Sequence, residues 1–189
     1  MKSTVLKLAA AAAVAICSAA PALANVLTFD DLNTGGAGAM GSSYQGYTFN
    51  GWWHIDNPPY GYPTASSPTI IYNSESSYTN VPEILFGQTV DVVSLYLANY
   101  SSGTVTLHGY LGATELYNTQ IQLTGAMVQY NVGFTGIDKF VMETTQNTFA
   151  FMDNLEVNAG RLPEPSSIAL VGLGLLGAAG IRRRGATRA

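Results

Sequence analysis

The chain has 189 residues, of which 47% are hydrophobic and 11% charged, and its formal net charge at pH 7 is −4. This length allows one domain plus targeting segments. Between residues 25 and 160, however, eleven acidic residues accompany a single basic one, Lys139, so this body carries a formal charge of −10. Such a charge excludes nucleic acids and anionic lipid surfaces as partners of the body. The only cysteine, Cys17, precedes the body, which therefore contains no disulfide.

The first 24 residues have the layout of a secretory signal peptide. Two lysines precede an apolar centre at residues 8–16, and Ala22-Leu23-Ala24 forms a small-x-small cleavage sequence. We therefore expect export, with cleavage between Ala24 and Asn25. The expected organisation is a signal peptide at residues 1–24, one domain at residues 25–160 and a C-terminal tail at residues 161–189.

Short runs typical of β-strands, separated by turn residues, fill the body, and no stretch shows a convincing helical period. Alternation is clearest at residues 90–100, where Val93, Leu95 and Leu97 share one face. Strands are predicted at residues 26–29, 47–53, 69–72, 83–86, 90–100, 104–110, 113–117, 120–123, 127–134, 137–143 and 149–157. This spacing predicts an all-β fold, an antiparallel β-sandwich of the jelly-roll type.

Two aspartates fall at inward positions of the first and last predicted strands. Strict alternation places Asp153 with Phe151 and Leu155 on the core face, and Asp31 with Phe29. A buried carboxylate needs a proton, hydrogen-bond donors or a cation, and the body offers one lysine and no arginine. Because first and last strands commonly lie side by side in such sandwiches, Asp31 and Asp153 are candidate ligands of one calcium ion.

Asp30 is a further candidate ligand of this ion. The sequences FDDL at residues 29–32 and MDNLEV at residues 152–157 resemble calcium-containing jelly-roll modules of the carbohydrate-binding type. The alternative is that Asp30 and Asp31 cap turns, while Asp153 marks a β-bulge and accepts hydrogen bonds from the backbone.

Both tryptophans of the chain lie in an aromatic segment at residues 51–63. Adjacent residues of a strand face opposite ways, so one of Trp52 and Trp53 is expected in the core and the other at the surface. Exposed rings suit sugars, because the apolar faces of sugars stack on them. We therefore predict Trp52, Trp53, Tyr60 and Tyr62 as ligand-binding residues; the alternative is a loop packed by its own aromatic and proline side chains.

Catalytic motifs are not evident. His54 and His108 lie far apart in the sequence, and neither a G-x-S-x-G elbow nor an H-E-x-x-H zinc motif is present. We therefore expect a non-enzymatic protein. Two rivals remain: a secreted polysaccharide hydrolase that uses a pair of the eleven acids, and an ice- or surface-binding protein.

The C-terminal stretch combines three features in a fixed order. Pro163-Glu164-Pro165 is a stiff, helix-breaking start, residues 166–181 form an uncharged run rich in Leu, Gly and Ala, and Arg182-Arg183-Arg184 follows. Taken alone, these features suit a linker, a core helix and a solvated tail. Their order predicts a short transmembrane helix that stops at the arginines, which stay on the cytoplasmic side.

This order resembles the PEP-CTERM sorting signal of Gram-negative bacteria. The resemblance implies that the membrane-embedded protease exosortase recognises Pro163, Glu164 and Pro165 and removes the tail. It also implies that the exported protein is held briefly in the inner membrane and then reaches the cell surface or the extracellular polysaccharide matrix. We therefore expect a structural or carbohydrate-binding component of that matrix.

Overall fold

The computed structural model describes residues 24–32, 35–41, 43–56, 61–73, 81–100, 102–145 and 148–159. Within them, ten strands and one short 3₁₀ turn follow each other as β1 (Ala24–Leu27), η1 (Asp30–Leu32), β2 (Ala37–Ala39), β3 (Thr48–Asn50), β4 (Trp52–Asp56), β5 (Thr69–Asn73), β6 (Glu83–Asn99), β7 (Ser102–Leu111), β8 (Thr114–Thr124), β9 (Val128–Thr144) and β10 (Ala150–Ala159). The signal peptide up to Leu23, the tail with its predicted helix, and Tyr60 lie outside the described residues.

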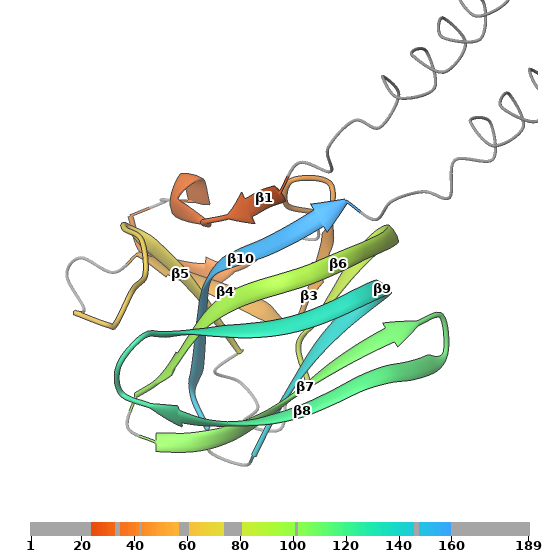
Figure 1. Cartoon of the computed structure of the whole chain (residues 1–189). Coiled ribbons are helices and arrows are strands. Elements are labelled where there is room, and N and C mark those ends of the chain that lie inside the picture. Colours follow the sequence, from red (N-terminus) through yellow and green to blue (C-terminus); the bar gives the residue numbers. More distant parts are fainter. Residues whose placement is uncertain are drawn as a thin grey trace, which may run out of the picture. The chain divides into compact units, whose positions relative to one another are not determined.

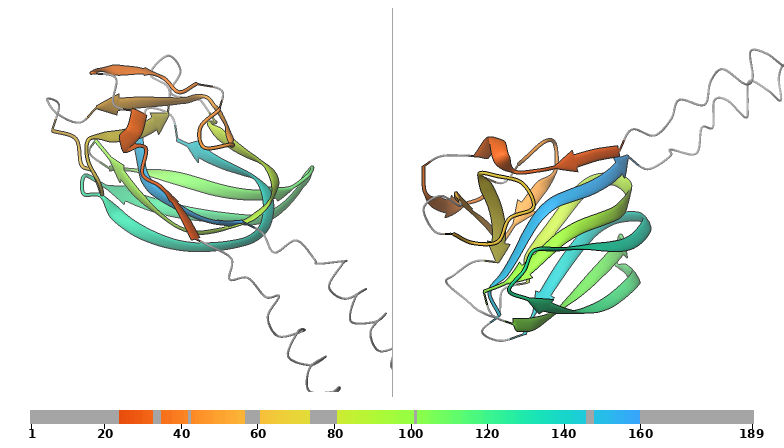
Figure 2. Two further views of the ribbon diagram at one scale, coloured as in Figure 1. Left: turned by 90° about the horizontal axis from the view of Figure 1, so that it is seen from above. Right: turned by 60° about the vertical axis from the view of Figure 1, so that its left-hand side comes forward.

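The strands join in one continuous antiparallel sheet that folds over itself. Its hydrogen-bonded order is β2-β4-β5-β10-β6-β9-β7-β8, while β1 pairs with β10 and β3 pairs with β6. In Figures 1 and 2 the early strands, drawn in orange and yellow, lie over one side of the curved sheet formed by β10, β6, β9, β7 and β8. The predicted all-β, jelly-roll-like sandwich is confirmed.

The main core fills the space between these two layers. Leu27, Phe49 and Trp52 from the early strands meet side chains such as Leu107 and Phe140 from the curved sheet. A second, smaller cluster lies on the opposite face of β4, β5, β10 and the end of β6; its buried members are Ile55, Ile70, Tyr72, Ala98 and Phe151. The sheet at this end of the molecule is therefore apolar on both faces.

The curved sheet contains three strands that are longer than the sequence predicts. Residues 83–99, 114–124 and 128–144 each form one strand, where the sequence suggests two. Gly87 and Gly133 have φ angles of 70° and 61°, which favour glycine. Gly87 lies within the register shift between Leu85 and Val90, and Gly133 lies opposite the shift between Val92 and Ser94, so neither forms a chain-reversing turn. These glycines therefore bend the strands without ending them.

The strict alternation that the sequence predicts for β10 is wrong, because the strand contains a bulge at Asn154. Asn154 has a φ of 44°, and the pairing of β10 with β6 shifts register between Asp153 and Glu156. The two faces of β10 therefore exchange at this bulge. Phe151 belongs to the second cluster, while Leu155 beyond the bulge belongs to the main core.

The beginning and the end of the described chain lie side by side. Strand β1 pairs antiparallel with the second half of β10, and Ala24 lies opposite Asn158. The predicted neighbourhood of first and last strands is thus confirmed. Cleavage after Ala24 would leave the paired residues from Asn25 onward in place. Within the part of the chain that the structure describes, no helix has the length and hydropathy to cross a membrane.

Candidate functional site

The two tryptophans face opposite sides of β4. Trp52 is 1% exposed and packs in the main core, and its indole Nε1 donates a hydrogen bond to the Glu83 backbone oxygen at 3.1 Å. Its ring is therefore not available to a ligand. Trp53 is half-buried and lies against the second cluster. Of the pair, only Trp53 remains a candidate ligand-binding residue.

Trp53 is the first ring of a continuous set that we call the aromatic row, made of Trp53, Tyr72, Phe149, Phe151, Tyr62 and Tyr100. Successive ring centroids are 6.5 Å apart for Trp53 and Tyr72, 4.8 Å for Tyr72 and Phe149, 5.1 Å for Phe149 and Phe151, 5.0 Å for Phe151 and Tyr62, and 6.2 Å for Tyr62 and Tyr100. These distances are typical of aromatic pairs in contact. The row therefore runs across β4, β5 and β10 to the end of β6.

The rings of the aromatic row differ in how much of each is exposed to solvent. Tyr72 and Phe151 are fully buried, Trp53, Tyr62 and Phe149 are half-buried, and Tyr100 is 73% exposed. The buried rings hold the others in place, because each contacts at least two neighbours in the row. The row therefore combines a fixed base with four rings that reach the surface.

Asp153 holds the segment that carries Tyr62 against β10. Its Oδ2 accepts hydrogen bonds from the backbone N–H groups of Ala65 at 2.8 Å and Ser66 at 2.9 Å. Its Oδ1 accepts one from the Asn154 N–H at 2.7 Å and a longer one from Ser66 Oγ at 3.4 Å. The carboxyl is 0% exposed, and this burial raises its pKa to about 6 against the lowering effect of these donors.

Two other aspartates hold neighbouring segments. Asp56, at the end of β4, accepts hydrogen bonds from the N–H groups of Gly35 at 2.6 Å and Gly36 at 2.9 Å. Its other oxygen accepts one from Thr69 Oγ1 at 2.8 Å. Asp30 accepts one from the Thr69 N–H at 3.2 Å. Asp56 thus connects the loop before β2 to the start of β5, and Asp30 connects η1 to the same residue of β5.

The three predicted calcium ligands are only partly brought together. Asp30 lies close enough to Asp153 that its negative charge contributes to the raised pKa of Asp153. Asp31 instead accepts a hydrogen bond from the Tyr44 hydroxyl at 2.6 Å. Burial, reinforced by this bond to Asp31, raises the pKa of Tyr44.

The donors around Asp153 correspond to the alternative reading of the sequence, in which this residue marks a bulge and bonds to the backbone. Among the described residues, no group of three or more His, Cys, Asp or Glu side chains is arranged to hold a metal ion. The described acids therefore do not fit a shared three-aspartate site. Calcium binding by this chain stays a prediction.

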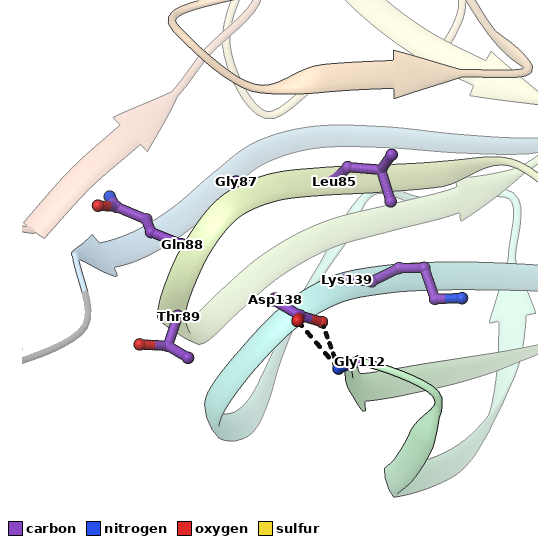
Figure 3. A pocket seen from close by; sticks show the side chains of 7 residues that line it. All are labelled: Leu85, Gly87, Gln88, Thr89, Gly112, Asp138 and Lys139. Atoms are coloured by element: carbon purple, nitrogen blue, oxygen red, sulfur yellow. Dashed lines mark hydrogen bonds between the residues drawn. The ribbon is translucent and has the colours of Figure 1, made fainter.

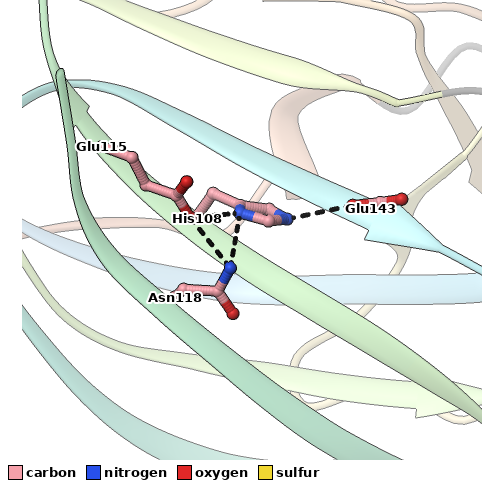
Figure 4. A network of polar contacts seen from close by, with 4 residues as sticks. All are labelled: His108, Glu115, Asn118 and Glu143. Carbon is pink, nitrogen blue, oxygen red and sulfur yellow. Dashed lines mark hydrogen bonds and ion pairs between the residues drawn. The ribbon is translucent and has the colours of Figure 1, made fainter.

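A polar network lies on the outer face of β7, β8 and β9 (Figure 4). His108 Nδ1 is 2.8 Å from Glu115 Oε1, and His108 Nε2 is 3.2 Å from Glu143 Oε2. The amide of Asn118 donates to Glu115 at 2.9 Å. The contacts with His108 and Asn118 lower the pKa of Glu115. Because both imidazole nitrogens already face carboxylates, we assign this network to the connection of three strands.

A shallow hollow of about 580 Å³ lies where β6 bends at Gly87 (Figure 3). Asp138 and Lys139 form part of its wall, and both Asp138 carboxylate oxygens accept from the Gly112 N–H, at 3.0 and 2.9 Å. No aromatic ring lines it; its members are Leu85, Gly87, Gln88, Thr89, Gly112, Asp138 and Lys139. It offers a sugar no surface for stacking, so the aromatic row is the stronger candidate.

Sequence reasoning found two members of the row, Trp53 and Tyr62, and missed the others. Tyr100 and Phe149 were assigned only to predicted strands. The sequence signal that could have identified them is their position at the ends of predicted strands. Tyr100 stands directly before the Ser101-Ser102-Gly103 turn, and Phe149 begins the last predicted strand. The pairing of Phe151 with Ala98 and Tyr72 then brings these strand ends beside β5.

Comparison with known proteins gives similar solved structures and one sequence motif, while no curated protein matches the chain. The CBM22-2 xylan-binding domain of Paenibacillus barcinonensis Xyn10C is 13% identical, with a TM-score of 0.42, over 71% of this chain and 98% of that domain. The module CBM29-2, of carbohydrate-binding family 29, is 12% identical, with a TM-score of 0.43, over 76% of this chain and 98% of the module.

A third similar structure is TmCBM61, solved in complex with β-1,4-galactotriose. It is 8% identical, with a TM-score of 0.38, over 62% of this chain and 91% of that one. What these modules bind is a property of those proteins. In the sequence itself, the model of the PEP-CTERM protein-sorting motif matches residues 162–184, and the chain therefore carries this sorting motif of exported, exosortase-processed proteins.

Proposed function

We propose that the body of this protein binds a glycan through the aromatic row and has no catalytic role. The observation that carries the proposal is the set of four half-buried or exposed rings, Trp53, Phe149, Tyr62 and Tyr100, held by fully buried Phe151 and Tyr72. Aromatic rings fixed in this way offer flat apolar surface at low entropic cost. Sugar rings, whose C–H faces are apolar, are ligands of matching chemistry.

Polar groups next to the row suit the hydroxyl groups of a sugar. The segment that carries Tyr62 also carries Ser66, whose Oγ lies 2.9 Å from Asn154 Oδ1 at the bulge of β10. Both residues are half-buried. A binding site needs only a few such polar groups to orient a ligand over an apolar base.

The sorting motif supports a place for this activity outside the cell. A glycan-binding domain that is exported and then released or retained at the cell surface meets extracellular polysaccharide there. We therefore propose a structural or carbohydrate-binding role in the exopolysaccharide matrix, with exosortase as the processing partner. Before processing, the predicted C-terminal helix would hold the protein in the inner membrane.

Retention on immobilised polysaccharides tests the proposal. The full chain, purified in detergent, is passed over a panel of neutral and charged polysaccharides that includes the extracellular polysaccharide of the producing cell. We expect retention by at least one polymer and none by the uncoated matrix. Absence of retention throughout the panel would contradict glycan binding, and release of reducing ends from a retained polymer would contradict a non-catalytic role.

A further inference from the structure

The charge of the body restricts the glycans that can approach the aromatic row. Eleven acidic residues and one lysine lie between residues 25 and 160. At physiological ionic strength, fixed charges act over a Debye length of about 8 Å. An anionic ligand that approaches the body therefore meets a strongly negative net charge.

Two acids lie in β10, the strand that carries Phe151. Asp153 follows Phe151 by two residues, and the neighbouring Asp30 is close enough to influence its pKa. Glu156 lies beyond the bulge, half-buried, and accepts a hydrogen bond from Ser94 Oγ at 2.8 Å. Its neighbours Leu155 and Val157 point into the main core, so Glu156 points away from it. Ionised Asp153 thus places negative charge beside Phe151, and Glu156 adds negative charge farther along β10.

The one lysine lies elsewhere. Lys139 extends from β9, and its Nζ lies 4.4 Å from the centroid of the Tyr110 ring on β7. Neither residue takes part in a ring contact of the row. Since residues 25–160 contain no other lysine or arginine, none is available in the body to pair with a carboxylate, sulfate or phosphate on a glycan stacked over the row.

We infer that the glycan bound by the aromatic row carries no anionic groups, an inference that rests on the proposed function. Stacking and neutral hydrogen bonds hold an uncharged polymer, and they depend little on salt. An anionic polymer of the same backbone would instead meet unpaired like charges, which oppose binding most strongly at low ionic strength.

A matched set of polymers tests this inference on the full chain in detergent. An uncharged polysaccharide retained in the panel is compared with the same polymer after its primary hydroxyls are oxidised to carboxylates. A third form, in which those carboxylates are converted to neutral amides, controls for the lost hydroxyls. Dissociation constants are measured for all three at low and high sodium chloride concentration.

At low salt, we expect the oxidised polymer to bind with an affinity at least about tenfold lower than that of the parent polymer. This difference in affinity should shrink at high salt, and the amide form should recover most of the affinity of the parent. Equal or tighter binding of the oxidised polymer, or retention of anionic polymers alone, would overturn the inference and leave glycan binding standing. Retention of no polymer at all would overturn the proposed function, and the inference with it.

Discussion

At the scale of single residues, the Asp153 carboxyl attaches Ala65 and Ser66, in the segment that carries Tyr62, to β10. Four donors surround its two oxygens, and three of them are backbone N–H groups of residues 65, 66 and 154. A carboxylate is one of the few side chains that can accept so many hydrogen bonds from converging backbone groups. Its complete burial opposes ionisation, so the segment at Tyr62 is attached by a group with a raised pKa.

The raised pKa predicts how stability depends on pH. The pKa of Asp153 is about 6 in the folded chain and about 3.9 in an unfolded one. The folded state therefore binds this proton more tightly, and the free energy of unfolding decreases as pH rises from about 4 to about 6. The contribution amounts to about 2–3 kcal/mol at about 1.4 kcal/mol per pKa unit.

Denaturant unfolding at several pH values, with wild type compared with Asp153→Asn, measures this contribution. The wild type should lose stability across this pH interval relative to the variant, because the amide does not titrate. Parallel pH profiles for the two proteins would contradict the raised pKa. A difference of opposite sign would show that its hydrogen-bond donors outweigh its burial.

The residues of the aromatic row show what sequence can predict at this scale. Adjacent indoles on a strand must face opposite ways, which the sequence established for Trp52 and Trp53. The sequence could not show which of them faces the core, because that depends on which face of β4 meets the curved sheet. Tyr100 was not recognised because its partner in the row, Tyr62, lies 38 positions earlier and reaches it only through tertiary packing.

At the scale of elements, bulges and positive-φ residues explain most differences from the predicted strands. Turn-like glycines suggested that residues 83–86 and 90–100 are separate strands. In β6 the chain bends at Gly87 and continues, since antiparallel pairing with β9 resumes at Val90. Local sequence signals a change of backbone direction there, but only the partner strand determines whether pairing continues.

The bulge in β10 changes which residues of the predicted site share a face, whereas the bend at Gly87 changes only the length of a strand. Strict alternation placed Phe151, Asp153 and Leu155 on one face, whereas the positive φ of Asn154 separates them onto two. Asn tolerates this conformation better than most residues. The burial of Asp153 was correctly predicted, and its donors in the segment at residues 65–66 could not be, because that contact spans 88 positions for Ala65.

Calcium binding near β1, η1 and β10 is a prediction that unfolding temperatures can check. An ion that binds only the folded state stabilises that state by mass action and so raises the melting temperature. At a free ion concentration 100 times the dissociation constant, the free energy of unfolding increases by about 2.7 kcal/mol. Such binding predicts a higher melting temperature in millimolar calcium than in chelator, with magnesium as the matched control. Identical melting temperatures in calcium and in chelator would contradict it.

A calcium effect that persists in Asp153→Asn and in Asp30→Asn would place the ion elsewhere. Asp31→Asn serves as the comparison, because Asp31 accepts a hydrogen bond from the Tyr44 hydroxyl. Loss of the effect in the first two variants and its retention in the third would place the ion between Asp30 and Asp153.

At the scale of the whole molecule, the aromatic row and the paired ends of the described body lie toward opposite ends of β10. Phe151 stands near the start of this strand, while Asn158 near its end pairs with Ala24. Seven residues of a strand span roughly 20 Å. The row is therefore distant from Ala159, the last described residue before the sorting motif in the sequence.

This arrangement predicts that residues 25–160 fold and bind as the full chain does. The members of both hydrophobic clusters all lie between residues 27 and 157, within the fragment. Size-exclusion chromatography, circular dichroism and glycan retention of this fragment are the measurements. A proteolysis-sensitive fragment without a cooperative transition would contradict independent folding. A folded fragment that binds much more weakly would show that the tail contributes to binding.

The central claim, glycan binding by the aromatic row, is tested most directly by calorimetric titration of a retained polysaccharide into three proteins. These are the wild type, the double variant Trp53→Ala/Tyr100→Ala, and the control Tyr110→Ala, which removes a ring outside the row. Each buried stacking ring contributes about 1–2 kcal/mol. We predict a loss of at least about tenfold in affinity for the double variant, measured at a temperature where circular dichroism shows it folded, and unchanged binding by the control. Equal affinity of all three proteins would contradict the claim.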